Sequence, residues 1–76
     1  MAFRPLPTSC WEKFLLSHGF RLDRITASHY IWKKAGWRSI PVWGDEKEVP
    51  PLHLKTGCAT IGCSIDDLYA WAANNC

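Results

Sequence analysis

Apolar and polar residues near the start of the chain repeat with the period of a helix. One semi-apolar face of this segment carries Trp11, Phe14, Leu15 and His18. Ser9 and Glu12 stand in the S-x-x-E order of a capping box, in which the two side chains satisfy free backbone N–H groups at a helix start. Gly19 supplies a residue suited to the left-handed conformation of a helix end. The pattern therefore predicts a first helix over about Cys10 to His18.

After Gly19 the apolar residues alternate with polar ones, which is the two-residue period of half-buried strands. Three short segments have this period: Phe20 with Leu22, Tyr30 with Trp32, and Ile40 with Val42. Their succession, with a turn at Ala35 and Gly36, predicts an antiparallel meander. Pro41 lies in the third segment and has no N–H to donate, so we expect that strand at an edge of the sheet.

The middle strand divides its side chains between two faces of the sheet. His29, Ile31 and Lys33 share one face, whereas Tyr30 and Trp32 share the other. We expect the two aromatic residues to face the core beneath the helices. His29 and Lys33 would then face solvent together.

The second half of the chain has helical signals. Pro50 and Pro51 end an extended segment and preset a first helical turn, and Gly57 weakens the helix by about 1 kcal/mol relative to alanine. This second helix stops at Gly62 and carries the apolar residues Leu52, Leu54, Cys58, Ala59 and Ile61. Residues 64–67, Ser-Ile-Asp-Asp, cap a last short helix. The order α-β-β-β-α-α predicts one α+β domain over residues 1–76, a three-stranded antiparallel sheet packed on helices.

Charge is unevenly distributed, although the net charge of the 76 residues is only +2. Residues 21–38 carry five basic side chains and one acidic one, whereas residues 39–76 carry two basic and five acidic ones. A basic segment of this kind attracts phosphate backbones. It is equally typical of an ordinary solvated strand surface, and charge alone does not separate the two interpretations.

Four cysteines stand at positions 10, 58, 63 and 76. Because the first seven residues do not have the pattern of a secretion leader, we expect reduced thiols and a cytoplasmic protein. The cysteine and histidine positions do not have a spacing typical of zinc, so we expect no metal, and no other cofactor is indicated. No apolar run approaches the ~18 residues that span a bilayer, so we expect no contact with membranes.

Several short strings occur in an order that resembles the HicA/YcfA-like toxins. They are Gly19-Phe20, Arg24, Ser28-His29-Tyr30, Lys33-Lys34 and Ile40-Pro41-Val42, followed by a helix after Glu48. The resemblance covers nearly the whole chain and implies a fold like a double-stranded-RNA-binding domain, with a histidine on the sheet. It further implies an mRNA endonuclease that a cognate HicB-type antitoxin holds inactive.

The family's short signature, Gly-Ser/Thr-His after the first strand, stands here as Ala27-Ser28-His29. Alanine replaces the usual glycine, and a turn that needs positive φ would strain Ala27 by about 1 kcal/mol or more. Trp43 stands where relatives often carry a polar residue or histidine. These departures leave open a second interpretation, a non-catalytic RNA-binding module of the same fold. A protein-interaction domain is a third.

His29 is the candidate catalytic residue. RNA can be cleaved by its own 2′-hydroxyl, so an enzyme need only move a proton and stabilise negative charge. An unperturbed imidazole has a pKa of about 6.5 and exchanges protons near neutral pH, so we expect His29 to act as general base or acid. The plain alternative is a histidine that rests on a sheet face. Ser28 points to the opposite face of the strand and is poorly placed as a nucleophile.

The candidate RNA-binding residues come from the basic segment and from the start of the second helix. They are Arg24, Ser28, Lys33, Lys34, Arg38, His53 and Lys55. His53 and Lys55 would lie beside free backbone N–H groups at the positive end of the helix dipole, which favours phosphate. Trp37, next to a turn and to Arg38, is the tryptophan that we expect to be exposed, for contact with a base or with the antitoxin.

Overall fold

The computed structural model describes residues 3–76. In chain order the elements are β1 (Leu6–Pro7), α1 (Thr8–Ser17), β2 (Arg21–Thr26), β3 (His29–Lys33), β4 (Ile40–Trp43), β5 (Glu48–Val49), α2 (Pro51–Ile61) and α3 (Ile65–Asn75). Strands β2, β3 and β4 form an antiparallel sheet in that order, so the predicted α+β meander with β4 and its Pro41 at an edge is confirmed. The pairing of β1 with β5 was not predicted, because strands of two residues are too short to show a period.

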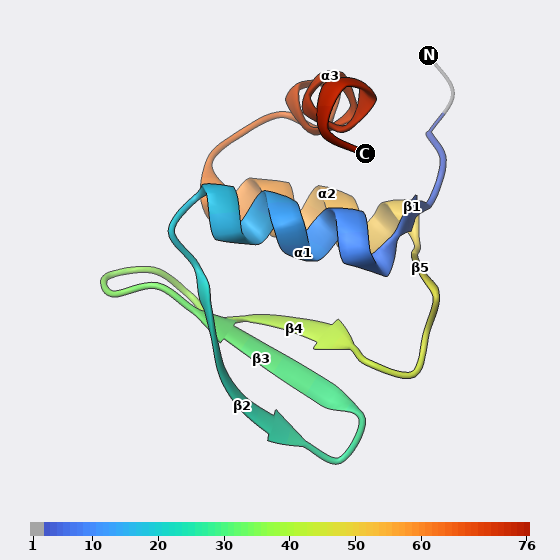
Figure 1. Cartoon of the computed structure of the whole chain (residues 1–76). Helices are drawn as coiled ribbons and strands as arrows, with labels where there is room; N and C mark the ends of the chain where they lie inside the picture. The colour runs from blue at the N-terminus through green and yellow to red at the C-terminus, as the bar shows by residue number, and fades with distance from the viewer. Residues whose placement is uncertain (1–2) are drawn as a thin grey trace.

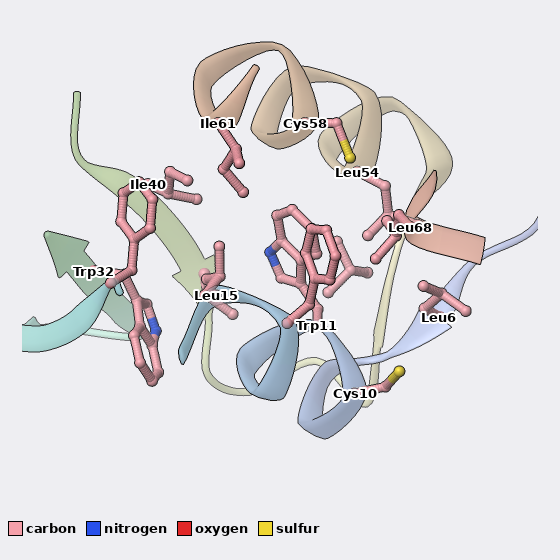
Figure 2. Close-up of a cluster of buried hydrophobic side chains, with 14 of the residues drawn as sticks. Leu6, Cys10, Trp11, Leu15, Trp32, Ile40, Leu54, Cys58, Ile61 and Leu68 are labelled. Carbon is pink, nitrogen blue, oxygen red and sulfur yellow. The ribbon is translucent and has the colours of Figure 1, made fainter. Parts of the chain in front are cut away.

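The three-stranded sheet lies on one side of the helices, and the hairpin of β2 and β3 extends away from them (Figure 1). α1 lies between this sheet and α3 in the view of Figure 1. Side chains from every layer meet in one core (Figure 2). Those that are fully enclosed are Trp11, Leu15, Phe20, Leu54, Cys58 and Leu68. None of the helices formed by residues 3–76 is long and apolar enough to cross a membrane.

The register of the sheet confirms the predicted division of faces. Trp32 lies opposite Ile40 and Tyr30 opposite Val42, and burial of Trp32, Ile40 and Val42 identifies theirs as the helix-facing side. His29 has its Cα opposite Trp43 on the other side. The predicted apolar face of α2 is wrong at two positions, since Leu52 is 71% exposed and Ala59 is also exposed.

The prediction that a capping box begins the first helix is also wrong. α1 begins at Thr8, after Pro7, and no side chain caps it, so Ser9 and Glu12 do not form a capping box. Instead the Thr8 N–H donates to the Lys47 carbonyl at 2.9 Å, next to the β1–β5 pair. A tertiary contact thus replaces the local cap. At α3 the predicted local cap does form, between Ser64 and Asp67.

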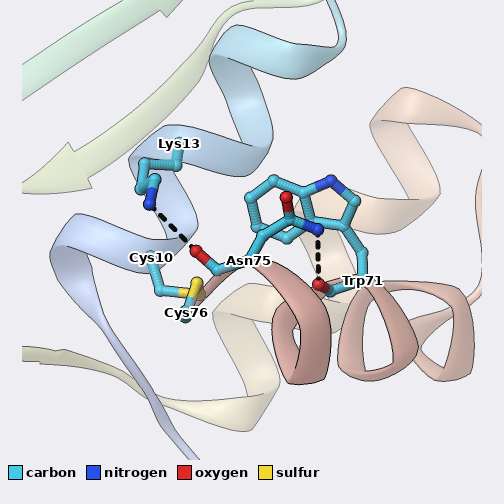
Figure 3. The surroundings of a disulfide bond; sticks show 5 residues. All are labelled: Cys10, Lys13, Trp71, Asn75 and Cys76. Carbon is cyan, nitrogen blue, oxygen red and sulfur yellow. Dashed lines mark hydrogen bonds between the residues drawn. A yellow bond between two sulfur atoms is a disulfide. The ribbon is translucent and has the colours of Figure 1, made fainter.

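The expectation of four reduced cysteines is wrong for two of them. Cys10, near the start of α1, forms a disulfide with Cys76 at the end of α3 (Figure 3). The Lys13 ammonium donates to the Asn75 carbonyl at 2.9 Å beside it. Spacing alone could not pair these residues, which are 66 positions apart and meet only when α1 packs on α3. Cys58 and Cys63 are free, and burial raises the pKa of the Cys58 thiol to about 12.

Gly57 lies where the Trp11 indole packs against α2. A Cβ atom at position 57 would stand 2.3 Å from Cζ2 of Trp11, whose side chain is fully buried. Alanine would favour the helix by about 1 kcal/mol, but overpacking a rigid buried ring costs roughly 1–3 kcal/mol. Gly57, which the sequence indicates as a weak point of the helix, therefore makes room for the Trp11 ring.

We expect Gly57→Ala to lower the free energy of unfolding by up to about 2 kcal/mol, as the net of these two effects. Urea denaturation of the variant measures it. Because the clash is with Trp11, the double variant Trp11→Phe/Gly57→Ala should lose less than the two single changes predict together. A Gly57→Ala protein more stable than the parent would contradict this packing.

Glu12 gives the stability a pH dependence. Burial raises the pKa of its carboxyl above the ordinary 4.5, and the nearby Trp32 indole N–H acts in the opposite direction. That buried N–H makes no hydrogen bond of ordinary geometry within residues 3–76. Below pH 4.5 the carboxyl is neutral in both folded and unfolded chains, whereas ionisation at higher pH costs the folded state stability.

We therefore expect Glu12→Gln to be more stable than the parent at neutral pH, by less than about 1 kcal/mol because the side chain remains partly in water. The difference should disappear in acid, where Glu12 is neutral too. Urea denaturation of both proteins at about pH 3.5 and pH 7 checks the sign. A gap that widened towards acid would contradict the assignment.

Candidate functional site

His29 begins β3 on the face of the sheet that the helices leave open. Its side chain is half-buried, and its ring meets that of Trp43 edge to face, with the centroids 4.8 Å apart and the planes at 89°. Trp43 ends β4 directly opposite His29. The imidazole therefore packs against the Trp43 ring but is not buried in the core.

A second histidine lies on the same tryptophan. His53, in the first turn of α2, stacks on Trp43 with ring centroids 4.8 Å apart and planes 23° from parallel. We call His29, Trp43 and His53 the His–Trp–His cluster. Within residues 3–76 no side-chain hydrogen bond engages the ring nitrogens of either histidine. The ring nitrogens of both histidines are therefore available for hydrogen bonds with a bound molecule.

Local backbone structure brings His29 and Trp43 together. The turn between β2 and β3 consists of Ala27 and Ser28, and Ala27 has φ of +52°, the positive value that its sequence position led us to consider. The Ser28 carbonyl accepts the Gly44 N–H at 2.7 Å, which ties this turn to the chain that follows β4. Gly44 has no room for a side chain, because a Cβ there would lie 1.9 Å from the Tyr30 ring. The signature residues thus position the cluster through their backbone.

Two of the predicted phosphate-binding cations lie on the open face but are paired with an acid. Asp23 contacts Arg24 at 3.0 Å and Lys33 at 3.7 Å. All three side chains are solvent-exposed, so each pair is worth at most about 1 kcal/mol and exchanges readily for a phosphate. Lys33 lies four residues along β3 from His29, which is roughly 13 Å at the rise of a strand. Arg24 and Lys33 therefore lie on the same face of the sheet as the cluster but farther along the strands.

The other predicted cations are not beside His29. Lys34 lies over the Trp37 ring at 4.9 Å, and Arg38 lies in the loop between β3 and β4 at the far end of the sheet. Lys55 lies over the Phe3 ring at 5.2 Å. His53 and Lys55 do not meet, because residues two apart point to different sides of a helix. Of the two side chains predicted to bind phosphate at the start of α2, only His53 therefore lies at that position.

A cavity of about 180 Å³ adjoins the cluster between β4 and α2. Its lining is formed by Ser39, Ile40, Pro41, Trp43, His53, Thr56, Gly57 and Thr60. Trp37, 46% exposed as predicted, lies with Arg38 on a wider hollow that shares Thr56 and Thr60 with this cavity. The cavity beside the cluster and this hollow therefore adjoin along α2 and extend from His53 towards Arg38.

Sequence reasoning found both histidines but not their common neighbour. The sequence indicates Trp43 as a departure from the family pattern and as one of several tryptophans that can stack on bases, but not that it joins the open sheet face to the start of α2. A helix start that follows the edge strand after a short loop is the one signal that places His53 near Trp43. No family model, no curated protein and no solved structure matches this chain.

Proposed function

We propose that this protein is an RNA endonuclease toxin of the HicA/YcfA-like kind, with His29 as the general base and a fold related to double-stranded-RNA-binding domains. The observation that carries the proposal is the partly exposed His29 imidazole on the open sheet face, free of protein hydrogen bonds within residues 3–76 and packed against Trp43. The arrangement α-β-β-β-α at the centre of the chain is compatible with that fold. An mRNA is the proposed substrate.

The proposed chemistry uses the substrate's own nucleophile. His29 removes the proton of a ribose 2′-hydroxyl, and the resulting oxygen attacks the adjacent phosphorus. The P–O5′ bond breaks, leaving a 2′,3′-cyclic phosphate and a free 5′-hydroxyl. No protein nucleophile is required in this scheme, and Ser28 lies in the turn before β3, not on the strand that carries His29.

RNA contact is proposed along the open face. Phosphates would displace the exposed Asp23 carboxylate from Arg24 and Lys33, and Arg21 lies opposite Lys33 on the same face. Trp43 offers an aromatic surface on which a base can stack, a contact that tolerates any sequence. Binding should weaken as salt rises, because phosphate contacts release counterions.

The proposal includes a HicB-type antitoxin and a cytoplasmic location. Exposed Trp37 beside Arg38 is the kind of aromatic and arginine pair that anchors protein interfaces. Because cytosolic thiols are kept reduced, a cytoplasmic location requires the Cys10–Cys76 disulfide to resist reduction there. Alkylation of cells at lysis, followed by mass measurement, distinguishes the disulfide from the reduced thiols.

The test is the incubation of purified protein with a labelled single-stranded RNA in the presence of a chelator. We expect products that end in a cyclic phosphate, and no cleavage of the same strand made with deoxyribose. Loss of cleavage on chelation would reject the metal-independent scheme. Salt-sensitive binding without any cleavage would instead leave the non-catalytic RNA-binding module, and absence of both would reject a role in RNA.

A further inference from the structure

We propose that His53 is a second catalytic residue, the general acid that protonates the leaving 5′ oxygen while His29 acts as the base. This inference rests on the proposed function and concerns protonation of the leaving oxygen, a step that His29 as the base does not assist. Its observation is that two imidazoles, one on β3 and one on α2, contact the same Trp43 ring.

The upper limit on the separation of the two histidines is compatible with one phosphate between them. Each imidazole centroid lies 4.8 Å from that of Trp43, so the two imidazoles are no farther apart than twice that distance. In-line displacement places the attacking and leaving oxygens on opposite sides of phosphorus. Two hydrogen bonds of about 2.6–3.2 Å, one on each side of that phosphate, span a gap of this size. We infer that one phosphate bound beside Trp43 reaches both rings, because each ring contacts that tryptophan.

The two proton transfers balance. His29 takes the 2′-hydroxyl proton as the O2′–P bond forms, and His53, entering as the imidazolium, gives its proton to O5′ as the P–O5′ bond breaks. The products are the cyclic phosphate, a 5′-hydroxyl, protonated His29 and neutral His53. Exchange with water restores both rings, so no metal or other reactant is consumed.

The surroundings of His53 leave its ring accessible to a substrate. The side chain is exposed at the start of α2, where it leans on Trp43. The titratable side chains that line a small cavity with it are Glu46 and Glu48, both in the segment that leads from β4 to α2. Lys55 is turned towards Phe3. No lysine or arginine of residues 3–76 lines that cavity.

The test compares two substrates that differ in their leaving group. An RNA dinucleotide releases an alkoxide that needs a proton, whereas uridine 3′-(4-nitrophenyl phosphate) releases a stable phenolate that does not. We expect His53→Phe, which retains an aromatic ring against Trp43, to slow dinucleotide cleavage by about 100-fold or more and cleavage of the nitrophenyl ester only a few-fold. His29→Ala should slow both.

The pH dependence gives a second measurement. The parent rate on the dinucleotide should rise and then fall with pH, because the base must be neutral and the acid protonated. His53→Phe should lose the alkaline fall, and His29→Ala should retain it in its residual activity. Near-ultraviolet circular dichroism and a melting curve establish that each variant is folded, with His53→Gln as a second replacement if the phenylalanine variant is not.

The outcomes separate the two proposals. If the parent cleaves neither substrate, the proposed function and this inference both fail. If His29 is needed but folded His53→Phe cleaves the dinucleotide at the parent rate, only the assignment of His53 fails. Equal losses on both substrates would make His53 a positioning residue and would likewise overturn the general-acid role.

Discussion

Replacing His29 with alanine is expected to slow RNA cleavage by about 100- to 10,000-fold, the contribution of a well-placed general base. The loss should appear in the rate of the chemical step, measured with enzyme in excess over labelled RNA. RNA affinity should change little, since the proposed phosphate contacts come from Arg24 and Lys33. Growth arrest on induced expression should disappear in parallel.

Two further variants make this expectation specific. His29→Gln keeps a polar side chain of similar reach against Trp43 but cannot exchange a proton at neutral pH, so it should be as slow as His29→Ala. His18→Gln removes a histidine that packs on Phe14 in the last part of α1, with ring centroids 4.5 Å apart. Because that ring is not part of the cluster, its variant should cleave like the parent. Parent rates in folded His29→Gln would end the case for catalysis by this residue.

Reduction of the Cys10–Cys76 disulfide is expected to lower the free energy of unfolding by about 4 kcal/mol. The bond closes a loop with a sequence separation of 66, almost the entire chain, so it removes much of the conformational freedom of the unfolded state. For a domain of this size such a loss is a large part of the total stability, which is about 5–15 kcal/mol in native proteins. Urea denaturation with and without a reductant measures it.

The matched control is the Cys10→Ser/Cys76→Ser protein. It should unfold at the lower urea concentration of the reduced parent and should not respond to the reductant, because the remaining thiols of Cys58 and Cys63 are already free. The buried side chains of Leu68 and Ala72 should keep α3 packed on the core in this variant. Equal stability of the oxidised and reduced parent would contradict this expectation, because reduction would then not increase the conformational freedom of the unfolded chain.

Much of the secondary structure followed from short-range signals. The alternation along β3 placed His29 and Trp32 on opposite faces, and the register agrees. Gly62 ends α2 in the left-handed conformation, and Ser64 caps α3 as its spacing with Asp67 indicates. These features depend on residues within one turn or one strand, where the sequence is sufficient.

Contacts between distant segments did not follow from such signals. The expected cap at Ser9 was replaced by the Thr8–Lys47 hydrogen bond beside the β1–β5 pair, and the expected thiol at Cys10 is joined to Cys76. The expected group of cations around His29 was dispersed along the sheet. Each difference arises where another element supplies a partner that local patterns do not contain.

The sequence by itself determined which side chains of the middle strand face solvent, and the resemblance of its motifs to the HicA/YcfA-like toxins made His29 the candidate. Only the tertiary structure decided what stands beside it. The return of the chain from β4 into α2 stacks His53 on the Trp43 ring that His29 already contacts. The physical reason is that backbone periodicity fixes the direction of a side chain, whereas its neighbours are fixed by how loops and packed helices bring separate segments together.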